Sequence, residues 1–305
     1  HKPHAASDVF QKRYGDCKDK TDLLLTMLKI AGIEAYPVLV PAQREYFDES
    51  MPSLNAFNHV IAAVPNGDSF FWLDATNETA SFNSPPFIRP SKVFLIHADG
   101  TYRFLETPAL DDQRDYSKSM ASLHIDSEGN ADISYHYTYF GKAAEAVRYI
   151  YKYLPPDQRK KIFEKRGVEV TDLSFGSFIE TESPFFVRLN GKLKNLAQVI
   201  DQNTMILSNV TRLDSYRDIT AASHRLYPVL LRPSFHTQQT FRYIFPAGFS
   251  VKSVPENFVS KQPHQDRTEK FSMQASVFEV HIENSNRGYK IIPSKIEDFK
   301  KHALE

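Results

Sequence analysis

The sequence predicts an α+β fold in two domains, in which one central helix packs on an antiparallel sheet and a β-sandwich-like domain follows. Three observations predict it. A helix-periodic apolar segment occupies residues 17–31, short strand-like segments recur through most of the remaining chain, and residues 106–119 are charged and without periodicity. We therefore expect one domain over residues 1–112 and a second over residues 113–305.

The helix of the first domain is predicted to begin at Cys17 and to end near Ala31. Asp16 suits the N-cap position, because its carboxylate can accept the unpaired backbone N–H groups of the first turn. Gly32 is a natural C-terminal stop. Apolar residues recur between these ends at helical spacing, so we expect the helix to be buried along most of its length. They are Leu23, Leu24, Leu25, Met27, Leu28 and Ile30.

Cys17 is the only cysteine of the chain, and its predicted place at a helix N-terminus suits a nucleophile. The positive end of the helix dipole favours the thiolate, which is the reactive form of the side chain. Asp16 and Asp19 oppose this effect. Lys18 and Lys20 support it, so the local charges roughly cancel. The thiol therefore needs a base.

A predicted β-hairpin supplies that base. Residues 57–64 and 69–75 read as strands, and Asn66-Gly67 between them is a strong signal for a tight turn. If this dipeptide forms a two-residue turn, His59 lies directly across from Asp74, with their Cβ atoms roughly 4.5–5.5 Å apart. A carboxylate in that position can hold an imidazole in one tautomer and stabilise its charged form.

The remaining elements of the first domain complete an antiparallel sheet. Strands are predicted over residues 33–40, 93–97 and 102–105. The polar stretch from Pro41 to Ala56 leads into the strand of the predicted base. We expect this stretch to form one wall of a substrate groove, because loops of this length are uncommon without a role.

These residues resemble the bacterial transglutaminase-like superfamily. The resemblance rests on four ordered blocks within residues 3–110, which are Arg13-Tyr-Gly-Asp-Cys-Lys-Asp-Lys20, Gly32-Ile-Glu-Ala-Tyr-Pro-Val-Leu-Val40, Phe57-Asn-His59 and Trp72-Leu-Asp-Ala-Thr76. It implies a papain-like core set between β-rich domains, with Cys17 as the nucleophile, His59 as the base and Asp74 as the acid that orients the base. The hairpin register gives the same His–Asp pair independently of the family.

The resemblance also carries expectations about the whole protein. Superfamily members normally have further helices before the nucleophile, whereas sixteen residues precede Cys17 here. We therefore expect the first domain to be truncated at its N-terminus and the chain to be a fragment of a longer multidomain protein. The resemblance implies a periplasmic or secreted location and a peptide or protein substrate. It requires neither a metal nor an organic cofactor.

Three further residues are candidates for the substrate site. Tyr14 and Asn58 are close in sequence to the nucleophile and to the base. Trp72 is predicted to pair with Ile61 on the face that carries the triad, where a place in the core is favoured over a substrate platform.

The second domain opens with a predicted hairpin over residues 121–126 and 131–139, whose alternating tyrosines favour sheet core over a ligand platform. A helical insertion is expected near residues 142–166, in which Pro155-Pro156 ends one helix and allows another to start. Short strands follow, separated by turns such as Asn190-Gly191, and this pattern is typical of a β-sandwich.

Composition argues against several classes of partner and site. The 37 basic and 37 acidic side chains give a net charge of zero, which argues against nucleic acid or an anionic membrane as the main partner. No apolar run approaches the ~20 residues that span a bilayer. One cysteine excludes an intramolecular disulfide and a C-x-x-C metal site. A site built from His1, His4 and Cys17 matches no standard zinc spacing, so no metal is predicted.

The sequence favours cysteine-dependent acyl transfer on peptide or protein amides, with hydrolysis as the leading outcome. Transglutaminase cross-linking stays open, because the same triad serves an amine acceptor as well as water. A different class also stays open, namely a catalytically idle binding or scaffold module with the same fold. The third alternative is a fragment that folds but needs its upstream segment for activity.

Overall fold

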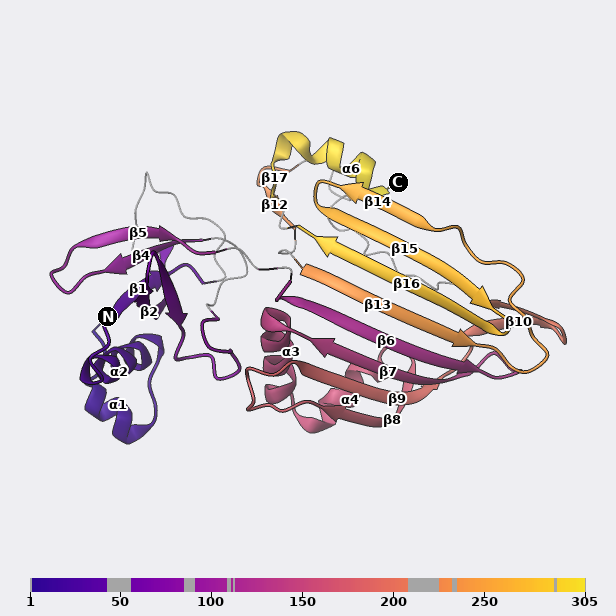
Figure 1. Cartoon of the computed structure of the whole chain (residues 1–305), viewed down its shortest axis with the longest axis horizontal. Helices are drawn as coiled ribbons and strands as arrows, with labels where there is room; N and C mark the ends of the chain where they lie inside the picture. The colour runs from indigo at the N-terminus through magenta and orange to yellow at the C-terminus, as the bar shows by residue number, and fades with distance from the viewer. Residues whose placement is uncertain are drawn as a thin grey trace. The chain divides into compact units, whose positions relative to one another are not determined.

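A computed structural model describes residues 2–42, 56–84, 91–108, 111, 113–207, 225–231, 235–287 and 290–304 (Figure 1). Its mixed α+β architecture consists mostly of strands, with few helices. The chain divides into two compact units, His1–Asp111 with Phe178–Glu182, and Asp112–Ser177 with Ser183–Glu305. The main division lies inside the charged stretch 106–119, and no sequence feature pointed to residues 178–182 as part of the first unit.

The first unit contains, within the described residues, one five-stranded sheet and two helices. The strands lie in the order β3-β2-β1-β4-β5, and every neighbouring pair is antiparallel. Helix α2 contacts β1 and β2, and α1 contacts α2. The elements are α1 (Ala6–Lys12), α2 (Cys17–Ile30), β1 (Tyr36–Val40), β2 (His59–Asn66), β3 (Ser69–Leu73), β4 (Lys92–Ile96) and β5 (Tyr102–Glu106).

Helix α2 begins at Cys17, as predicted, because Asp16 caps it. The Asp16 carboxylate accepts the backbone N–H groups of Lys18 and Asp19. The Asp19 carboxylate accepts the N–H of Asp16 in return, which completes a capping box. The helix ends at Ile30, and Gly32 just beyond it takes a φ of 71° that favours glycine.

The prediction that α2 is buried along most of its length is wrong. Its buried residues are Asp19 and Thr21, both in the first half of the helix. Met27 and Ile30 in the second half are 53% and 82% exposed. Helical periodicity predicts that an apolar stripe exists, but only contact with the sheet decides how much of the stripe is covered.

The β2–β3 hairpin turns one residue later than predicted. Asn66 pairs with Ser69, so Gly67 and Asp68 form the turn. Gly67 has a φ of 59°, whereas Asp68 is not among the residues with positive φ. A turn with glycine in the first central position is of type II′, whereas the predicted Asn-Gly turn requires positive φ at both central residues.

The later turn changes the cross-strand partners but not the faces. Trp72 pairs with Ala63 and not, as predicted, with Ile61. His59 and Asp74 are no longer directly opposed, since pairing ends before Asp74. The shift amounts to one residue on each strand, so residues that shared a face still share it. Both side chains therefore remain on one face of the sheet.

The core of the first unit lies on the face that carries His59. Buried apolar side chains from four strands meet there, namely Val38, Val40, Ile61, Ala63, Trp72, Val93 and Leu95. His59 is paired with Val40 and therefore lies on the same side of the sheet. Because each fully buried aliphatic side chain contributes roughly 1.5–3 kcal/mol, this cluster is the main support of the strand that carries the histidine.

The second unit contains one large sheet, short ribbons and three α-helices within its described residues. Its elements are β6 (Tyr116–Ile125), β7 (Ala131–Tyr139), α3 (Gly141–Tyr153), α4 (Pro156–Glu164), β8 (Val168–Phe175), β9 (Phe185–Leu193), β10 (Ala197–Asp201), β11 (Thr204–Leu207), β12 (Val229–Leu230), β13 (Phe235–Ile244), β14 (Phe258–Gln262), β15 (Gln265–Gln274), β16 (Val277–Asn286), β17 (Lys290–Ile291), the 3₁₀ helix η2 (Pro293–Lys295) and α6 (Ile296–Leu304).

The large sheet has, in the described part of the chain, eight strands in the order β14-β15-β16-β13-β6-β7-β9-β8. Neighbours are antiparallel except β13 and β6, which are parallel. The β-rich character of this unit is confirmed, but the predicted sandwich of two sheets is not what these strands form. The β10–β11 ribbon instead provides part of a second layer, through Leu196, Ala197, Met205 and Leu207.

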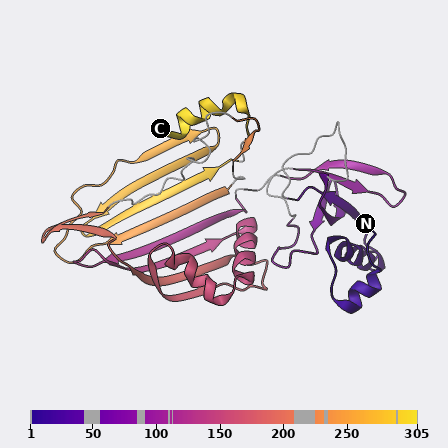
Figure 2. The same cartoon turned by 180° about the vertical axis from the view of Figure 1, so that it is seen from behind.

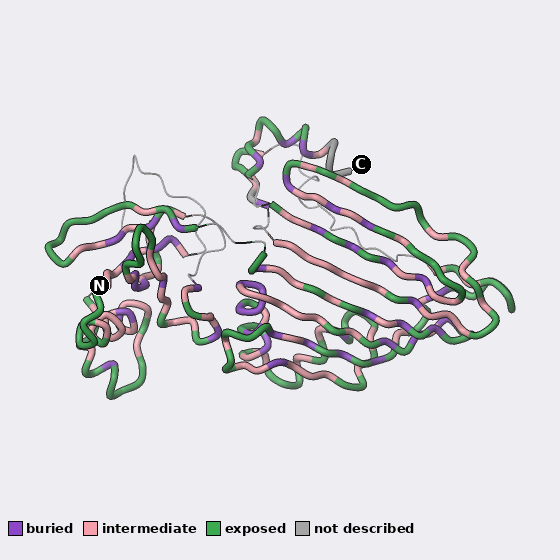
Figure 3. Tube along the Cα trace, in the orientation of Figure 1, coloured by how far each residue is buried: buried purple, intermediate pink, exposed green. Residues whose placement is uncertain are grey.

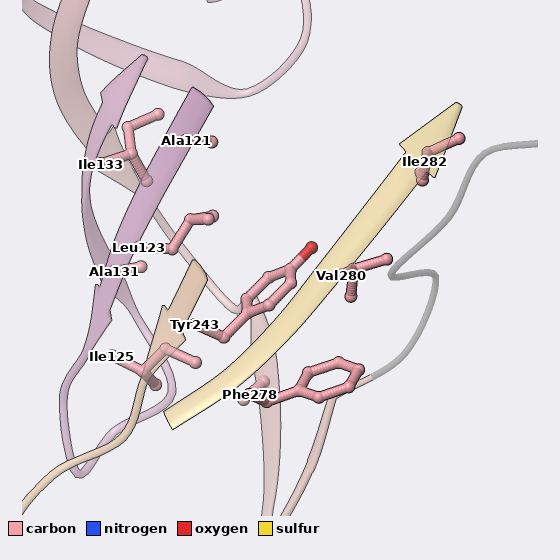
Figure 4. Close-up of a cluster of buried hydrophobic side chains, with 10 residues drawn as sticks. Ala121, Leu123, Ile125, Ala131, Ile133, Tyr243, Phe278, Val280 and Ile282 are labelled. Carbon is pink, nitrogen blue, oxygen red and sulfur yellow. The ribbon is translucent and has the colours of Figure 1, made fainter. Parts of the chain in front are cut away.

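The core of the second unit lies on one face of this sheet. Alternate residues of β6, β7 and β16 are buried along much of each strand, and Figure 3 shows this alternation. Figure 4 shows the central cluster, in which Tyr243 lies between Leu123 and Val280. Burial follows the period of two that the sequence shows, because successive side chains in a strand point to opposite faces.

The tyrosine stripe of β7 extends the same face. The rings of Tyr135 and Tyr137 stack with centroids 5.4 Å apart, and those of Tyr137 and Tyr139 with centroids 6.3 Å apart. Tyr135 packs on the buried cluster. Burial raises the pKa of all three phenols. The stripe therefore belongs to the sheet core, as expected.

Helices α3 and α4 lie against the β6–β8 side of the sheet, as Figure 2 shows. The sequence predicted a helix from residue 142 to 154, and α3 begins and ends one residue earlier. Arg148 of α3 is fully buried, and it donates hydrogen bonds to the carbonyls of Ser177 and Ser183. These bonds offset part of the cost of burying its charge and join the two chain ends that flank residues 178–182.

The sequence predicted a turn at Asn190-Gly191, but both residues lie within β9. A Cβ atom on Gly191 would lie 2.6 Å from the carbonyl oxygen of Glu169, so the neighbouring strand approaches too closely for a side chain. The pairing of β8 with β9 is irregular here, between Val170 and Asp172. The glycine therefore serves a close strand contact at a bulge.

Replacing this glycine tests that interpretation. We expect Gly191→Ala to destabilise the second unit by about 1–3 kcal/mol, because the added methyl must displace backbone. Such a loss lowers Tm by roughly 2–12 °C in a unit of this size, which thermal unfolding followed by circular dichroism can measure. The exposed neighbour Asn190→Ala is the control and should change little. An unchanged Tm for Gly191→Ala would contradict the close contact.

Candidate active site

Cys17 occupies the first position of α2, where the cap leaves its backbone N–H available. Asp16 accepts from the second and third residues of the helix, Lys18 and Asp19. Within the described residues, the N–H of Cys17 has no hydrogen-bond acceptor. A free N–H beside a nucleophile is the geometry that an oxyanion requires. The same cap therefore places the cysteine at the helix start and leaves a donor next to it.

The charges around the thiol largely neutralise one another. The Lys18 ammonium contacts the Asp16 carboxylate, and this contact raises the pKa of Lys18 and lowers the pKa of Asp16. Lys18 is thus engaged mainly by the cap residue, and its ammonium interacts more weakly with Cys17. The helix terminus is a further positive element beside the cysteine.

His59 and Asp74 are in direct contact. Nε2 of His59 lies 2.9 Å from Oδ2 of Asp74, and the two side chains are 15% and 4% exposed. An ionised carboxylate can only accept, so the proton of this bond is on Nε2 and Nδ1 holds the basic lone pair. Nδ1 has no hydrogen-bond partner in the described part of the chain. In the neutral form of the imidazole, Nδ1 is thus the free nitrogen that can take a proton.

Asp74 stays ionised despite its burial. Desolvation by itself would raise the pKa of Asp74, but hydrogen bonds from His59 and Thr76 outweigh it, and the pKa lies below its usual value. Thr76 donates both its backbone N–H, at 2.9 Å, and its hydroxyl, at 2.6 Å, to Oδ1 of Asp74. The orienting acid therefore keeps its charge at neutral pH.

Thr21 fixes helix α2 beside the strand that carries His59. Its hydroxyl donates a 3.0 Å hydrogen bond to the carbonyl of Val60, the residue after His59. Thr21 follows Cys17 by one helical turn, so both lie on the same side of α2. This anchor was not predicted. The sequence shows a threonine one helical turn after the cysteine, but only the structure shows that this hydroxyl is buried and therefore needs a partner.

The structure thus brings two of the three predicted catalytic residues together and anchors the third nearby. His59 and Asp74 are bonded, and Cys17 starts the helix that Thr21 ties to β2. No hydrogen bond joins Sγ of Cys17 to the imidazole among the described residues. Contact between sulfur and imidazole is therefore part of the proposal made below.

The three substrate-site candidates have different surroundings. Tyr14 is 83% exposed. Asn58 is exposed too, but its side-chain amide donates to the carbonyl of Ala42. Trp72 is 5% exposed and lies in the core cluster, which leaves little of its ring for a ligand. Most of the stretch predicted as a groove wall, residues 43–55, lies outside the described residues.

The carboxylate of Asp19 connects the N-terminal segment to the nucleophile helix. It accepts hydrogen bonds from the backbone N–H of His4, at 2.9 Å, and from Nδ1 of the same residue, at 3.0 Å. With the N–H of Asp16, these bonds lower the pKa of Asp19 to about 2. Among the described residues, no cluster of three or more metal-ligating side chains occurs, and His1 lies outside them.

Comparison with protein-family models and with curated proteins gave no match. Among solved structures, the chain is similar to a protein from Parabacteroides distasonis described as "a putative protease". Sequence identity is 15% and the TM-score is 0.52. The similarity covers 99% of the present chain and 43% of the other, so this chain spans less than half the length of its structural neighbour.

At 15% identity, this similarity concerns the fold. It extends over both units of the present chain, so the succession of a small α+β unit and a large sheet occurs in a solved structure. None of the helices in the described ranges has the length and apolar character needed to cross a bilayer.

Acid should weaken the connection between His4 and the nucleophile helix. Because the pKa of Asp19 is lowered from 3.8 to about 2 on folding, its contribution is present above pH 3.8 and is lost as the pH falls through about 2. We therefore expect Asp19→Asn to be less stable than the wild type at pH 7, with a difference that shrinks towards pH 2. Denaturant unfolding at several pH values measures this.

Asp22→Asn provides a matched control on the same helix, because the side chain of Asp22 makes no hydrogen bond or ion pair with the described residues. We expect that variant to follow the wild type at every pH. A stability difference for Asp19→Asn that is constant from pH 7 to pH 2 would contradict the role assigned to the carboxylate.

Proposed function

We propose that this chain catalyses cysteine-dependent acyl transfer on peptide or protein amides, most favourably their hydrolysis. The observation that supports this best is the bonded His59–Asp74 pair, which carries a free imidazole nitrogen on the strand beside the helix of Cys17. The residue types and their order along the chain are those of a Cys-His-Asp triad. The transglutaminase-like resemblance of the sequence supports the same reading of the first unit as a papain-like core.

In this proposal, Nδ1 of His59 removes the proton of the Cys17 thiol. The thiolate sulfur attacks the amide carbonyl, the C–N bond breaks, and the imidazolium returns the proton to the leaving amine. Asp74 stabilises the imidazolium without accepting its proton, since the hydrogen bonds on this carboxylate keep its pKa low. A thioester on Cys17 remains.

The cap of α2 supplies the electrostatic part of the proposed reaction. The tetrahedral intermediate carries a negative oxygen, and the backbone N–H of Cys17 is unpaired among the described residues. This donor stands at the positive end of the helix dipole. Removal of a single oxyanion donor typically costs about 10²–10³ in rate, so one N–H at this position is a substantial contribution.

The second half of the reaction distinguishes the enzyme classes. Water attacking the thioester gives hydrolysis, and an amine gives cross-linking. The same imidazole can activate either nucleophile, so the acceptor and not the triad decides the product. We favour hydrolysis because bacterial members of the transglutaminase-like superfamily, which the sequence resembles, are often proteases or amidases. The protein described as "a putative protease" is compatible with hydrolysis.

One observation favours a second function, that of a catalytically idle binding or scaffold module. Within the described residues, the sulfur of Cys17 makes no hydrogen bond with His59. A triad that never closes would leave the fold as a platform for other proteins. The experiment below separates the two functions.

The chain has one cysteine, so alkylation reports on Cys17 alone. If His59 activates the thiol, iodoacetamide should react with the wild type at pH 6 at least about tenfold faster than with a thiol of ordinary pKa near 8.5. His59→Ala should lose this excess. A wild type that reacts like a free thiol, with no effect of His59→Ala, would favour the idle module.

Activity on amides tests the proposal directly. We expect the wild type to cleave members of a fluorogenic peptide library and Cys17→Ala to lose about 10³-fold or more of that activity, as nucleophile variants of triad enzymes do. Cys17→Ser controls for the shape of the side chain and should be nearly as inactive. Equal cleavage by the wild type and Cys17→Ala would exclude the proposed function.

Asp74→Asn should keep the fold and lower the rate constant for acylation by about 10²–10⁴, because an amide stabilises the wrong tautomer of His59. Asp68→Asn, in the exposed turn of the same hairpin, is the matched control. Single-turnover kinetics on a cleaved peptide measure both variants. A loss of similar size in the control would mean that the hairpin and not the charge matters.

A further inference from the structure

The two oxygens of the Asp74 carboxylate have different partners. Oδ2 lies 2.9 Å from Nε2 of His59. Oδ1 accepts the backbone N–H of Thr76 at 2.9 Å and its hydroxyl at 2.6 Å. The carboxylate therefore cannot rotate about its Cβ–Cγ bond without breaking hydrogen bonds at both oxygens. Such a terminal torsion is otherwise broad, so this restraint has to come from a neighbour.

The segment after β3 is held by two successive turns of the same kind. Asp74 Oδ1 accepts from the backbone N–H and the hydroxyl of Thr76, and Asn77 Oδ1 accepts from the same two groups of Thr79. Thr79 is fully buried. Asn77 also donates its N–H to the carbonyl of Asp74, at 3.4 Å. The backbone that presents the carboxylate is therefore fixed by local hydrogen bonds.

The Thr76 hydroxyl lies beside the His–Asp bond without replacing it. Its oxygen is 3.5 Å from Nε2 of His59, which is too long for a strong hydrogen bond. The single hydroxyl proton is used on Asp74, at 2.6 Å. Thr76 thus acts on the imidazole through the carboxylate and does not compete for the Nε2 proton.

We propose that Thr76 is a positioning residue of the site, which holds Asp74 so that Oδ2 faces His59 and leaves Nδ1 of the imidazole as the base. This inference rests on the proposed function, because it assigns a role within the same triad. Thr76 does not touch the sulfur or a substrate carbonyl. Its effect passes through the tautomer and the orientation of the histidine, which the bond at Nε2 determines.

The chain contains a matched copy of this motif whose carboxylate accepts no hydrogen bond from a described histidine, although His97 acts on it electrostatically. In the β4–β5 hairpin, Thr101 donates its backbone N–H, at 2.9 Å, and its hydroxyl, at 2.6 Å, to Oδ1 of Asp99. The two distances equal those at Asp74, but the Asp99 motif is exposed and bonds no imidazole. Thr101→Val therefore removes the same hydrogen bond and should leave the site unchanged.

The test compares Thr76→Val, Thr76→Ser and Thr101→Val. A hydrogen bond to a charged group is worth a factor of about ten or more, so we expect Thr76→Val to lower the iodoacetamide rate of Cys17 and kcat on a cleaved peptide by about tenfold, with KM little changed. Thr76→Ser keeps the hydroxyl and should restore both. Thr101→Val should match the wild type.

NMR spectroscopy can detect the effect of Thr76 on the His59 imidazole without any substrate turnover. The Nε2–H proton of His59 should give a downfield NMR resonance, assigned by its loss in His59→Gln, and Thr76→Val should shift or broaden it. Thr76→Ser and Thr101→Val should leave it in place. If Thr76→Val does not fold, Thr76→Ala replaces it in each assay.

The outcomes separate this inference from the proposed function. If Cys17→Ala abolishes cleavage while Thr76→Val keeps the wild-type rates and the His59 resonance, the function stands and the role of Thr76 is wrong. If Cys17→Ala cleaves as well as the wild type, the function fails whatever Thr76 does. A resonance that moves in Thr76→Val alone supports the positioning role even without a known substrate.

Discussion

The hydrogen bond between His59 and Asp74 is the interaction on which the functional reading of this protein depends. It joins the beginning of β2 to the chain just beyond β3, and it exists because both residues lie on the core face of the same sheet. The Asp74 carboxylate is nearly buried, and hydrogen-bond donors to both of its oxygens offset the cost of burying its charge. Without them, desolvation would favour the neutral acid, and the histidine would lose the group that fixes its tautomer.

The first unit combines two independent local devices to build this site. One is the capping box of α2, which uses the carboxylates of Asp16 and Asp19 and leaves the N–H of Cys17 unpaired among the described residues. The other is the turn after β3, in which Thr76 restrains Asp74. The hydroxyl of Thr21, bonded to Val60, connects them by tying the helix to the strand. The capping box and the turn are each formed by residues close in sequence. The buried hydrogen bond of Thr21 joins the helix to the sheet.

How far a sequence predicts such a site depends on the range of the interactions. The start of α2 was predictable from Asp16 and its approximate end from Gly32, because each residue acts on its own neighbours in the chain. The His–Asp pair was predicted by counting residues from the expected hairpin turn. The turn lies one residue later, at Gly67, but the prediction of a common face still holds, because a shift by one residue on each strand keeps every side chain on its face. Burial of the α2 stripe was predicted wrongly, since Met27 and Ile30 find no cover among the described residues.

The sequence by itself determined the α+β class, the position of the only cysteine at a helix start, and the common face of His59 and Asp74. These follow from capping, periodicity and strand parity, which act over a few residues. Only the tertiary structure decided that eight strands of the second unit join in one sheet in the described chain, that Gly191 lies inside β9, and that Thr21 anchors α2. Those features depend on which distant segments meet, and packing between segments far apart in the chain leaves no periodic signal in either one.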